Sequence, residues 1–168
     1  KGFELAPYLE EARQQLHQET DYEEEGRHLA AFGALLNDAP DFVVPKHYPL
    51  WSTREILAMS YEQGSPIEDA SSLDEDERLR IATALISLTL KELFGFGIMQ
   101  TDPNFANYRC AHSTGKIILL DFGATRTLDT KIVDHYRRLL RAGLDDDSHE
   151  MRAVAEEMGL FASNTPDH

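Results

Sequence analysis

The sequence predicts an α+β fold in which helices predominate. Three stretches carry apolar residues at intervals of three or four, at about residues 8–36, 72–94 and 130–160, a pattern typical of amphipathic helices. Short apolar segments bounded by proline, glycine and serine lie between them, as expected of strands and turns. A chain of 168 residues is long enough to bury a sizeable core, so it should form one domain or two lobes of one.

The first helical stretch, from about Tyr8 to Leu36, is charged and should form one or two helices. Its apolar residues recur at helical spacing over much of its length: Leu9, Ala12, Leu16, Leu29, Ala30 and Phe32. A polar run with a proline at 37–41 ends it. Two strands are expected next, at 42–44 and 55–59.

A long helix should follow, beginning near Ser72 and Glu75, which have the spacing of a capping box. Its apolar positions repeat at helical intervals: Leu79, Ala82, Leu85, Ile86, Leu90, Leu93 and Phe94. Gly95 and Gly97 mark its end. We expect it to be a core helix.

The segments 108–111 and 116–120 are expected to pair as a hairpin, because the polar turn between them contains Gly115. Two further helices should follow Asp129, on either side of the acidic run at 145–147.

Charge and cysteine content narrow the functional classes. Sixteen basic against thirty acidic residues give a net charge of −14, which disfavours a nucleic-acid partner. The single cysteine, Cys110, forms no internal disulfide, so a reducing, cytoplasmic location is the expectation.

The chemically informative region runs from Gln100 to Arg126. Asp102 and Asn107 stand before one predicted strand, and Asp121-Phe122-Gly123 follows the next. The hairpin should therefore present Asp102, Asn107 and Asp121 near one end. Carboxylate and amide oxygens are hard ligands that suit Mg²⁺ carrying phosphates.

Order and spacing together match the catalytic loop and metal loop of protein kinases, Asp-x-x-x-x-Asn followed by Asp-Phe-Gly. We therefore expect a protein-kinase-like fold with a mostly helical C-lobe.

The motifs resemble one branch of that superfamily, the UbiB family of atypical kinases linked to ubiquinone biosynthesis. The run Gln100–Asn107 has Gln-Thr-Asp where ordinary kinases have His-Arg-Asp, and the run Leu120–Arg126 is similar to the family's metal loop. The stretch Gln18–Glu25 is similar to the family's Glu-x-Asp motif, with Glu19 and Asp21 in the two acidic positions.

The resemblance implies a role for each matching residue. Asp121 would bind Mg²⁺ that bridges the phosphates of ATP or ADP, Asn107 would be a second oxygen ligand, and Asp102 would occupy the position of the catalytic base. Phe122 and Gly123 would complete the metal loop. Glu25 would pair with the nucleotide-binding lysine, its alternative being an ordinary solvated helix face.

Two further implications concern the periphery of the site. Glu19 and Asp21 would face the family's inhibitory extension. Met59 and Tyr61 fall where the inter-lobe hinge would hold an adenine edge, and their alternative role is ordinary packing.

The parts of a kinase that cover and grip the phosphates are not visible. No glycine- or alanine-rich nucleotide loop precedes Glu19, and neither the lysine strand nor the family's Lys-x-Gly-Gln motif is present. The resemblance therefore implies an incomplete N-lobe: residues 1–60 would be its remnant, with a helix equivalent to αC and two strands, and residues 61–168 would be the C-lobe. We expect the C-terminal part of a UbiB-type atypical kinase or ATPase, whose isolated chain turns over little. The alternatives are a pseudokinase-like scaffold or regulatory domain, and a small-molecule kinase of the aminoglycoside type.

The resemblance also suggests partners: a lipid or quinone precursor, other proteins of quinone synthesis, and in the full-length protein a peripheral position at the inner membrane. An incomplete sheet would expose strand edges near Phe42 and Ile56 and favour a homodimer through them.

Overall fold

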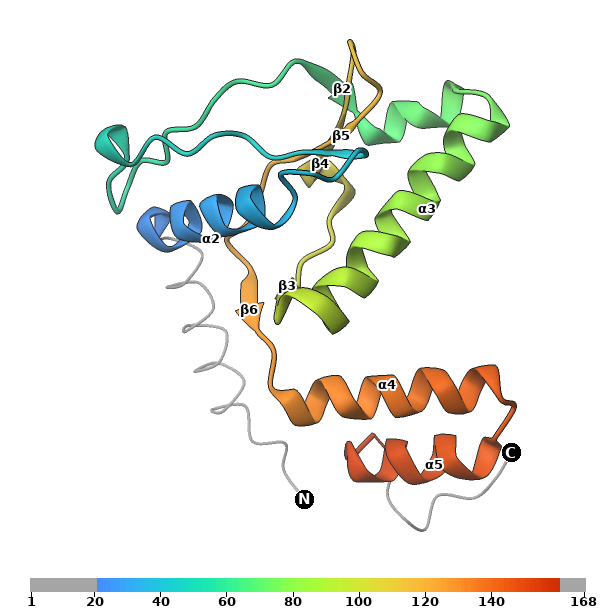
Figure 1. The fold of residues 1–168 in the computed structure, drawn as a ribbon. Coiled ribbons are helices and arrows are strands. Elements are labelled where there is room, and N and C mark those ends of the chain that lie inside the picture. The colour runs from blue at the N-terminus through green and yellow to red at the C-terminus, as the bar shows by residue number, and fades with distance from the viewer. Residues whose placement is uncertain (1–20, 161–168) are drawn as a thin grey trace, which may run out of the picture. The chain divides into compact units, whose positions relative to one another are not determined.

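The computed structural model describes residues 21–160, which contain helices and two small sheets (Figure 1). The helices are α2 (Tyr22–Leu35), α3 (Glu75–Lys91), α4 (Thr130–Leu144) and α5 (Ser148–Glu157). The strands are β1 (Phe42–Val43), β2 (Gly64–Pro66), β3 (Ile98–Gln100), β4 (Tyr108–Ala111), β5 (Ile117–Leu119) and β6 (Thr125–Thr127). The mixed, helix-rich fold is as predicted.

The chain divides into two compact units. The first contains the residues up to 89 together with 100–126, and the second contains 90–99 and the residues from 127 onward. The predicted boundary at residue 60 concerns kinase lobes and not these compact units, so it stays a prediction.

The first unit is built on a four-stranded sheet with the order β1-β5-β4-β2. The predicted hairpin is present, since β4 and β5 are antiparallel with Tyr108 opposite Leu119. β1 lies parallel to β5, with Phe42 opposite Ile117. β1 is therefore an edge strand, as expected of Phe42, and the homodimer through such edges stays a prediction.

The core of this unit lies between the sheet and the helices α2 and α3. It consists of the buried side chains Leu29, Phe32, Leu36, Phe42, Ile67, Ile81, Ala84, Leu88, Ile117, Ile118, Leu119 and Phe122. Leu79 and Ile86, on another face of α3, are exposed. The expectation of a core helix therefore holds for one face of α3.

Two local predictions are wrong. The helix α3 is capped by Asp74, whose carboxylate accepts the Glu77 N–H at 2.9 Å, while the Ser72 hydroxyl donates to the Asp69 carbonyl. Asp is as good a cap as Ser, and it lies closer to the helix. Residues 55–59 form no strand either: they make only isolated bridges, His47 with Met59 and Thr53 with Ile56.

Gly64 on β2 offers a direct test of the sheet packing. A Cβ atom there would lie 2.5 Å from the Cys110 carbonyl oxygen and 2.8 Å from Ile118 Cδ1. Gly64→Ala should therefore lower the free energy of unfolding by about 1–3 kcal/mol, measured by urea denaturation. Gly143→Ala is the matched control, because its Cβ meets nothing within 4 Å on helix α4, and it should stabilise by about 0.5–1 kcal/mol. Equal effects of the two changes would contradict this packing.

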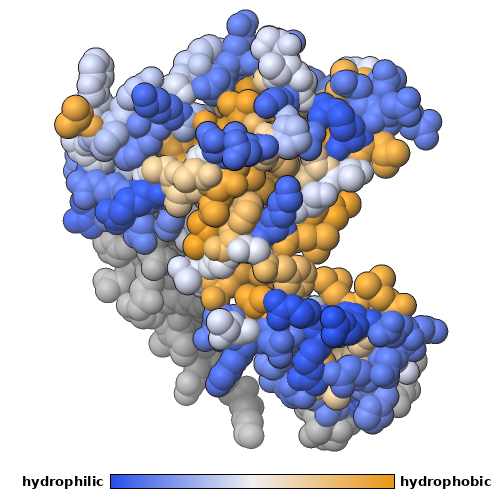
Figure 2. All heavy atoms as spheres, in the orientation of Figure 1, coloured by the Kyte–Doolittle hydropathy of each residue, from blue (hydrophilic) through white to orange (hydrophobic). Residues whose placement is uncertain are grey.

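The second unit contains α4 and α5, which pack through Ala142, Val154 and Ala155. Asp147, the last residue of the acidic run, caps α5 by accepting the Glu150 N–H at 3.0 Å. Four residues spaced by four along α4 are exposed: Ile132, Tyr136, Leu140 and Leu144. Figure 2 shows exposed apolar side chains on this helix. Within residues 21–160, no helix has the length and apolar character of a membrane span.

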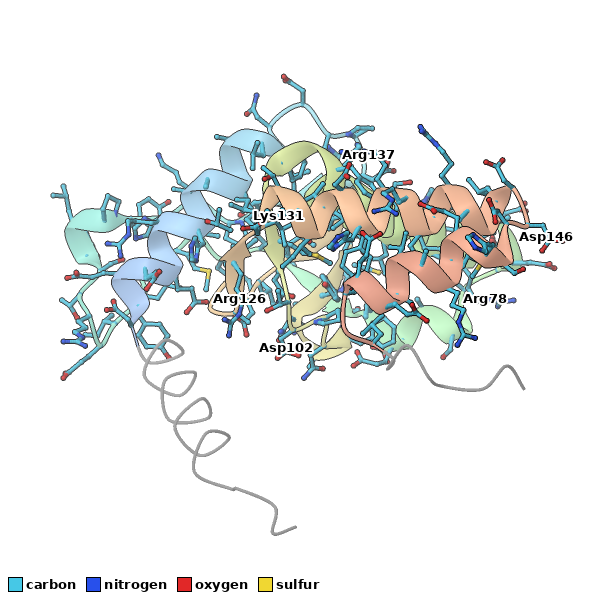
Figure 3. All side chains as sticks on the ribbon, turned by 90° about the horizontal axis from the view of Figure 1, so that it is seen from below. Arg78, Asp102, Arg126, Lys131, Arg137 and Asp146 are labelled. Atoms are coloured by element: carbon cyan, nitrogen blue, oxygen red, sulfur yellow. The ribbon has the colours of Figure 1, made fainter. Side chains whose placement is uncertain are left out.

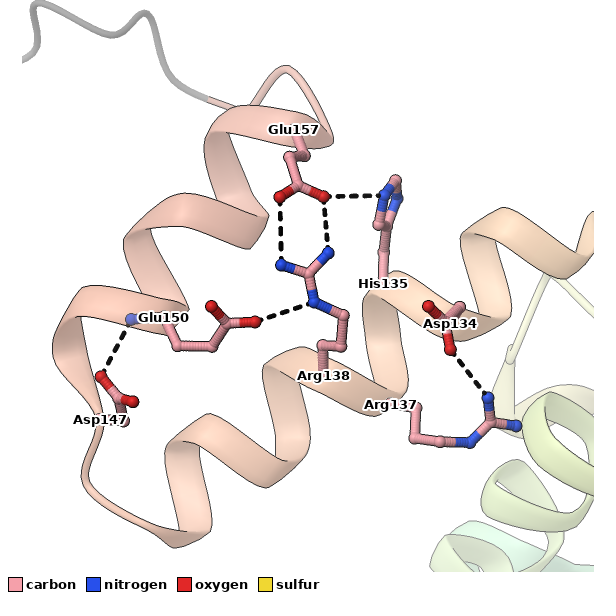
Figure 4. A network of polar contacts seen from close by, with 7 residues as sticks. All are labelled: Asp134, His135, Arg137, Arg138, Asp147, Glu150 and Glu157. Atoms are coloured by element: carbon pink, nitrogen blue, oxygen red, sulfur yellow. Dashed lines mark hydrogen bonds and ion pairs between the residues drawn. The ribbon is translucent and has the colours of Figure 1, made fainter.

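Arg138 joins the two helices of this unit (Figure 4). Its guanidinium donates to both carboxylate oxygens of Glu157, at 2.6 and 3.1 Å, and to Glu150 at 2.8 Å. His135 Nε2 lies 3.5 Å from Glu157. The hydrogen bond from Arg138 lowers the pKa of Glu157 below its ordinary value.

This network predicts a pH-dependent contribution to stability. A carboxyl whose pKa is lower in the folded state stabilises above its ordinary pKa, and this contribution is lost as the pH falls through the folded value. Glu157→Gln should therefore lower the melting temperature at neutral pH, and the difference from the unsubstituted protein should narrow on acidification. Glu156→Gln, which removes a single pair with Arg152, is the control with the smaller effect. A Glu157→Gln difference that is independent of pH would contradict the prediction.

Candidate functional site

A cavity of about 650 Å³ opens in the first unit and brings together the polar residues of several segments. Four carboxylates line it, from Glu25, Glu55, Asp102 and Asp121. The other lining residues are uncharged: Tyr22, Ile56, Leu57, Met59, Leu120, Gly123 and Ala124. Within residues 21–160, no lysine or arginine is part of the lining, so the cavity attracts cations.

Glu25 lies in the first turn of α2 and is only 9% exposed. Its Oε1 accepts the Phe122 N–H at 3.4 Å. Burial raises the pKa of Glu25, repulsion by Asp121 raises it further, and the Phe122 N–H works in the opposite direction. Among the residues described, Glu25 therefore faces a second carboxylate where the resemblance predicts a lysine.

Asp121 follows β5, where the chain leaves the sheet. Its Oδ1 accepts the N–H of Gly123 at 2.9 Å. A Cβ on Gly123 would lie 3.4 Å from this Oδ1 and 3.8 Å from Glu25 Oε2, so the two carboxylates face the same small volume. The absence of a side chain at Gly123 keeps that volume open.

Phe122 points away from the cavity and anchors this loop in the core. It is buried, and its ring centroid lies 4.9 Å from that of Phe32 on α2, with the planes tilted by 42°. A buried aromatic next to a carboxylate at the cavity fixes the direction of each, because reversing them would expose the ring to water and bury the carboxylate.

Asp102 and Asn107 belong to the loop that follows β3. Asp102 lines the cavity and is exposed, and Figure 3 shows it at the molecular surface. Asn107 ends a short 3₁₀ helix, Phe105–Asn107, and its carbonyl oxygen accepts the Leu120 N–H at 3.0 Å. Asn107 is thereby held beside the residue that precedes Asp121, although it is not among the lining residues.

Only some of the remaining predicted site residues line the cavity. Met59 lines the cavity, whereas Tyr61 is 87% exposed and does not. Asp21 caps α2 and lies 3.7 Å from Arg54. Glu19 lies outside the described residues.

The sequence reasoning missed Glu55 and Tyr22 as lining residues. Glu55 lies in the segment predicted to be a strand, and its neighbours Ile56, Leu57 and Met59 line the cavity as well. Tyr22 directly follows Asp21 and carried no independent signal.

The oxygens present fit a divalent cation. Asp121 and Glu25 converge with no cation beside them among the described residues, and buried like charges are costly unless a cation neutralises them. Carboxylates of this kind, with further oxygens from water and phosphate, are what Mg²⁺ prefers.

Comparison with known proteins gives a consistent family. The model of the ABC1 atypical kinase-like domain matches residues 1–155. The chain is 37% identical over 150 residues to "Atypical kinase COQ8B, mitochondrial" of Rattus norvegicus, covering 89% of this chain and 28% of that protein. It is 39% identical over 140 residues to "Atypical kinase COQ8, mitochondrial" of Saccharomyces cerevisiae, covering 83% and 28%. The chain thus spans less than a third of these relatives.

A solved structure supports the fold. The complex of Rv3197 with erythromycin from Mycobacterium tuberculosis matches with a TM-score of 0.79, over 99% of this chain and 42% of that one. Sequence identity is 20%, so this likeness concerns the fold alone.

Proposed function

Because the chain belongs to the family of ABC1 atypical kinase-like domains and has a kinase-like fold, we propose that its carboxylate-lined cavity binds Mg²⁺ and the phosphates of ATP or ADP. The observation that carries the proposal is the convergence of Glu25, Asp102 and Asp121 on one cavity. These residues come from three segments far apart in the chain, and each occupies a kinase motif position.

In this proposal each residue has a definite task. Asp121 binds the metal, and Asn107 adds an oxygen once its side chain turns toward the cavity. Asp102 accepts the proton of the attacking group. Bound Mg²⁺ would neutralise the phosphate charge and assist phosphoryl transfer. Met59 contributes to the adenine side of the site, and its exposed neighbour Tyr61 has the weaker claim.

Charge explains why binding should require the metal. A triphosphate entering a cavity lined by four carboxylates and no described cation is repelled. Mg²⁺ held by Asp121 would offset this repulsion with its two positive charges. The nucleotide lysine that Glu25 would pair with in the family is not on the described lining, so the isolated chain should bind weakly and turn over slowly.

The experiment is isothermal titration of ATP and ADP into the 168-residue chain, with and without Mg²⁺. Binding that occurs only with Mg²⁺ supports the proposal. No heat at millimolar nucleotide with Mg²⁺ would overturn it for this chain and favour the pseudokinase-like scaffold, for which the absence of a lysine or arginine from the described lining is the supporting observation.

For the whole protein we propose an atypical kinase or ATPase that supports ubiquinone biosynthesis. The support is the family membership and the relatives named COQ8, which are themselves described as mitochondrial. A lipid or quinone precursor, other quinone-synthesis proteins and a peripheral position at the inner membrane belong to the same proposal. The aminoglycoside-type kinase remains an alternative without a supporting contact in the cavity.

A further inference from the structure

Two residues directly before Asp102 hold the backbone around Asp121. The N–H and the hydroxyl of Thr101 both donate to the Ala124 carbonyl, at 3.1 and 2.7 Å. The Gln100 side-chain amide donates to the Asp121 carbonyl at 3.4 Å. Both ends of the segment 121–124 are therefore tied to the residues that lead into Asp102.

The length of the Thr101 bond and the burial of Gln100 indicate that these contacts fix the conformation of the segment 121–124. The Thr101 hydroxyl bond has the length most common for O–H···O hydrogen bonds. Gln100 is only 8% exposed, and a buried amide is costly unless it is hydrogen-bonded. The Gln100 bond is longer than the Thr101 hydroxyl bond, so Thr101 makes the closer contact with the Asp121 loop.

The covalent chain alone does not fix the distance between Asp102 and Asp121. Asp102 and Asp121 are separated by a 3₁₀ helix and the β4–β5 hairpin, whose turn is exposed at 112–114. β3 also pairs with β6, and the Asn107 carbonyl accepts the Leu120 N–H at 3.0 Å. The bonds of Gln100 and Thr101 are the contacts that tie the segment 121–124 to the residues directly before Asp102. Loss of the hydroxyl would leave the Ala124 carbonyl with the longer N–H bond of Thr101 as its remaining bond to this segment.

We propose that Thr101 is a positioning residue whose hydroxyl holds the Asp121 loop at a fixed distance from Asp102. The proposal rests on the proposed function, because it assigns the hydroxyl the task of setting the metal-binding carboxylate against the proton-accepting one. It also concerns regulation. Ordinary protein kinases have arginine before this aspartate, and kinase loops are commonly ordered by pairing arginine with a phosphorylated residue. Here an uncharged hydroxyl that already has a backbone acceptor holds the loop without a phosphate.

The test compares Thr101→Val, which removes the hydroxyl at constant shape, with Thr101→Ser, which keeps it. Thr89→Val is the matched control, since the Thr89 hydroxyl also donates to a backbone carbonyl, that of Leu85, but on α3 and outside the cavity. Two quantities are measured on the 168-residue chain: amide hydrogen exchange of residues 122–125, with the amides of α3 as internal reference, and the Kd for ATP with and without Mg²⁺.

We expect exchange of the 122–125 amides to be roughly tenfold faster in Thr101→Val, the effect of losing about one hydrogen bond. The α3 reference should not change, Thr101→Ser should restore slow exchange, and Thr89→Val should leave the 122–125 amides unaffected. The Kd for Mg²⁺-ATP should rise by a similar factor in Thr101→Val alone.

Several outcomes would overturn the inference. Unchanged exchange in Thr101→Val, or fast exchange in Thr101→Ser as well, would show that the hydroxyl does not hold the loop. Faster exchange with an unchanged Kd for Mg²⁺-ATP would show that the bond does not position the metal ligand. If exchange responds as expected but the unsubstituted chain binds no Mg²⁺-nucleotide, the holding role of Thr101 is supported and the proposed function has failed.

Discussion

Asp121→Asn is expected to weaken the Mg²⁺-dependent binding of ATP to this chain by about 100-fold or more. Losing a residue that merely supports a metal ligand costs about 10–100-fold in affinity, and loss of the ligand itself should cost at least as much. Asparagine keeps the shape of the side chain and an oxygen that can accept the Gly123 N–H, so the loop should keep its conformation. The measurement is the Kd from isothermal titration with Mg²⁺.

The same substitution distinguishes a loss of metal binding from a loss of folding stability. Asp121→Asn removes the repulsion that helps to raise the pKa of Glu25, so the metal-free variant should be no less stable than the unsubstituted protein. Asp134→Asn is the control, because it removes an exposed carboxylate that pairs with Arg137 in the other unit. Equal nucleotide affinity in Asp121→Asn and Asp134→Asn would rule out Asp121 as the metal ligand.

Phe32→Ala is expected to have the largest effect on stability. Phe32 is fully buried and packs against Phe122, so truncation loses apolar burial and leaves a cavity between α2 and the Asp121 loop. The free energy of unfolding should fall by about 3–5 kcal/mol, a large share of the roughly 5–15 kcal/mol typical of a folded protein. Urea denaturation followed by circular dichroism measures it.

Leu50→Ala is the control for that change. Leu50 is 95% exposed, so its truncation should alter the stability by no more than about 0.5 kcal/mol. The smaller change Phe32→Leu should have an intermediate effect, because leucine fills part of the cavity. A loss below about 1 kcal/mol in Phe32→Ala would mean that α2 is not packed on this loop.

Much of the candidate site was predictable because its signals are local. Asp102, Asn107 and Asp121 lie in short motifs whose order can be read in the sequence. The hairpin between them follows from two short segments joined by a polar turn that contains a glycine. The structure places Asp102 and Asp121 on one cavity. It leaves Asn107 beside that cavity and Tyr61 outside it, because motif order does not determine which side chains line a cavity of the folded unit.

Errors arose where a local pattern competed with packing. Residues 55–59 form a short apolar run that favours a strand, but only isolated bridges form there, and the segment instead lines the cavity with Glu55, Ile56, Leu57 and Met59. The spacing of Ser72 and Glu75 suggested a helix cap, yet Asp74 lies nearer and its carboxylate is the stronger acceptor.

The sequence by itself determined the helix-rich α+β class, most of the helices, the hairpin, the order of the kinase motifs and the family resemblance, because periodicity, turn residues and motif spacing act over a few residues. Only the tertiary structure decided that β1 lies parallel to β5, that Glu25 meets Asp121 without a cation on the described lining, and that Thr101 binds Ala124. Each of these joins segments distant in the chain, and such contacts are selected by the packing of the whole unit.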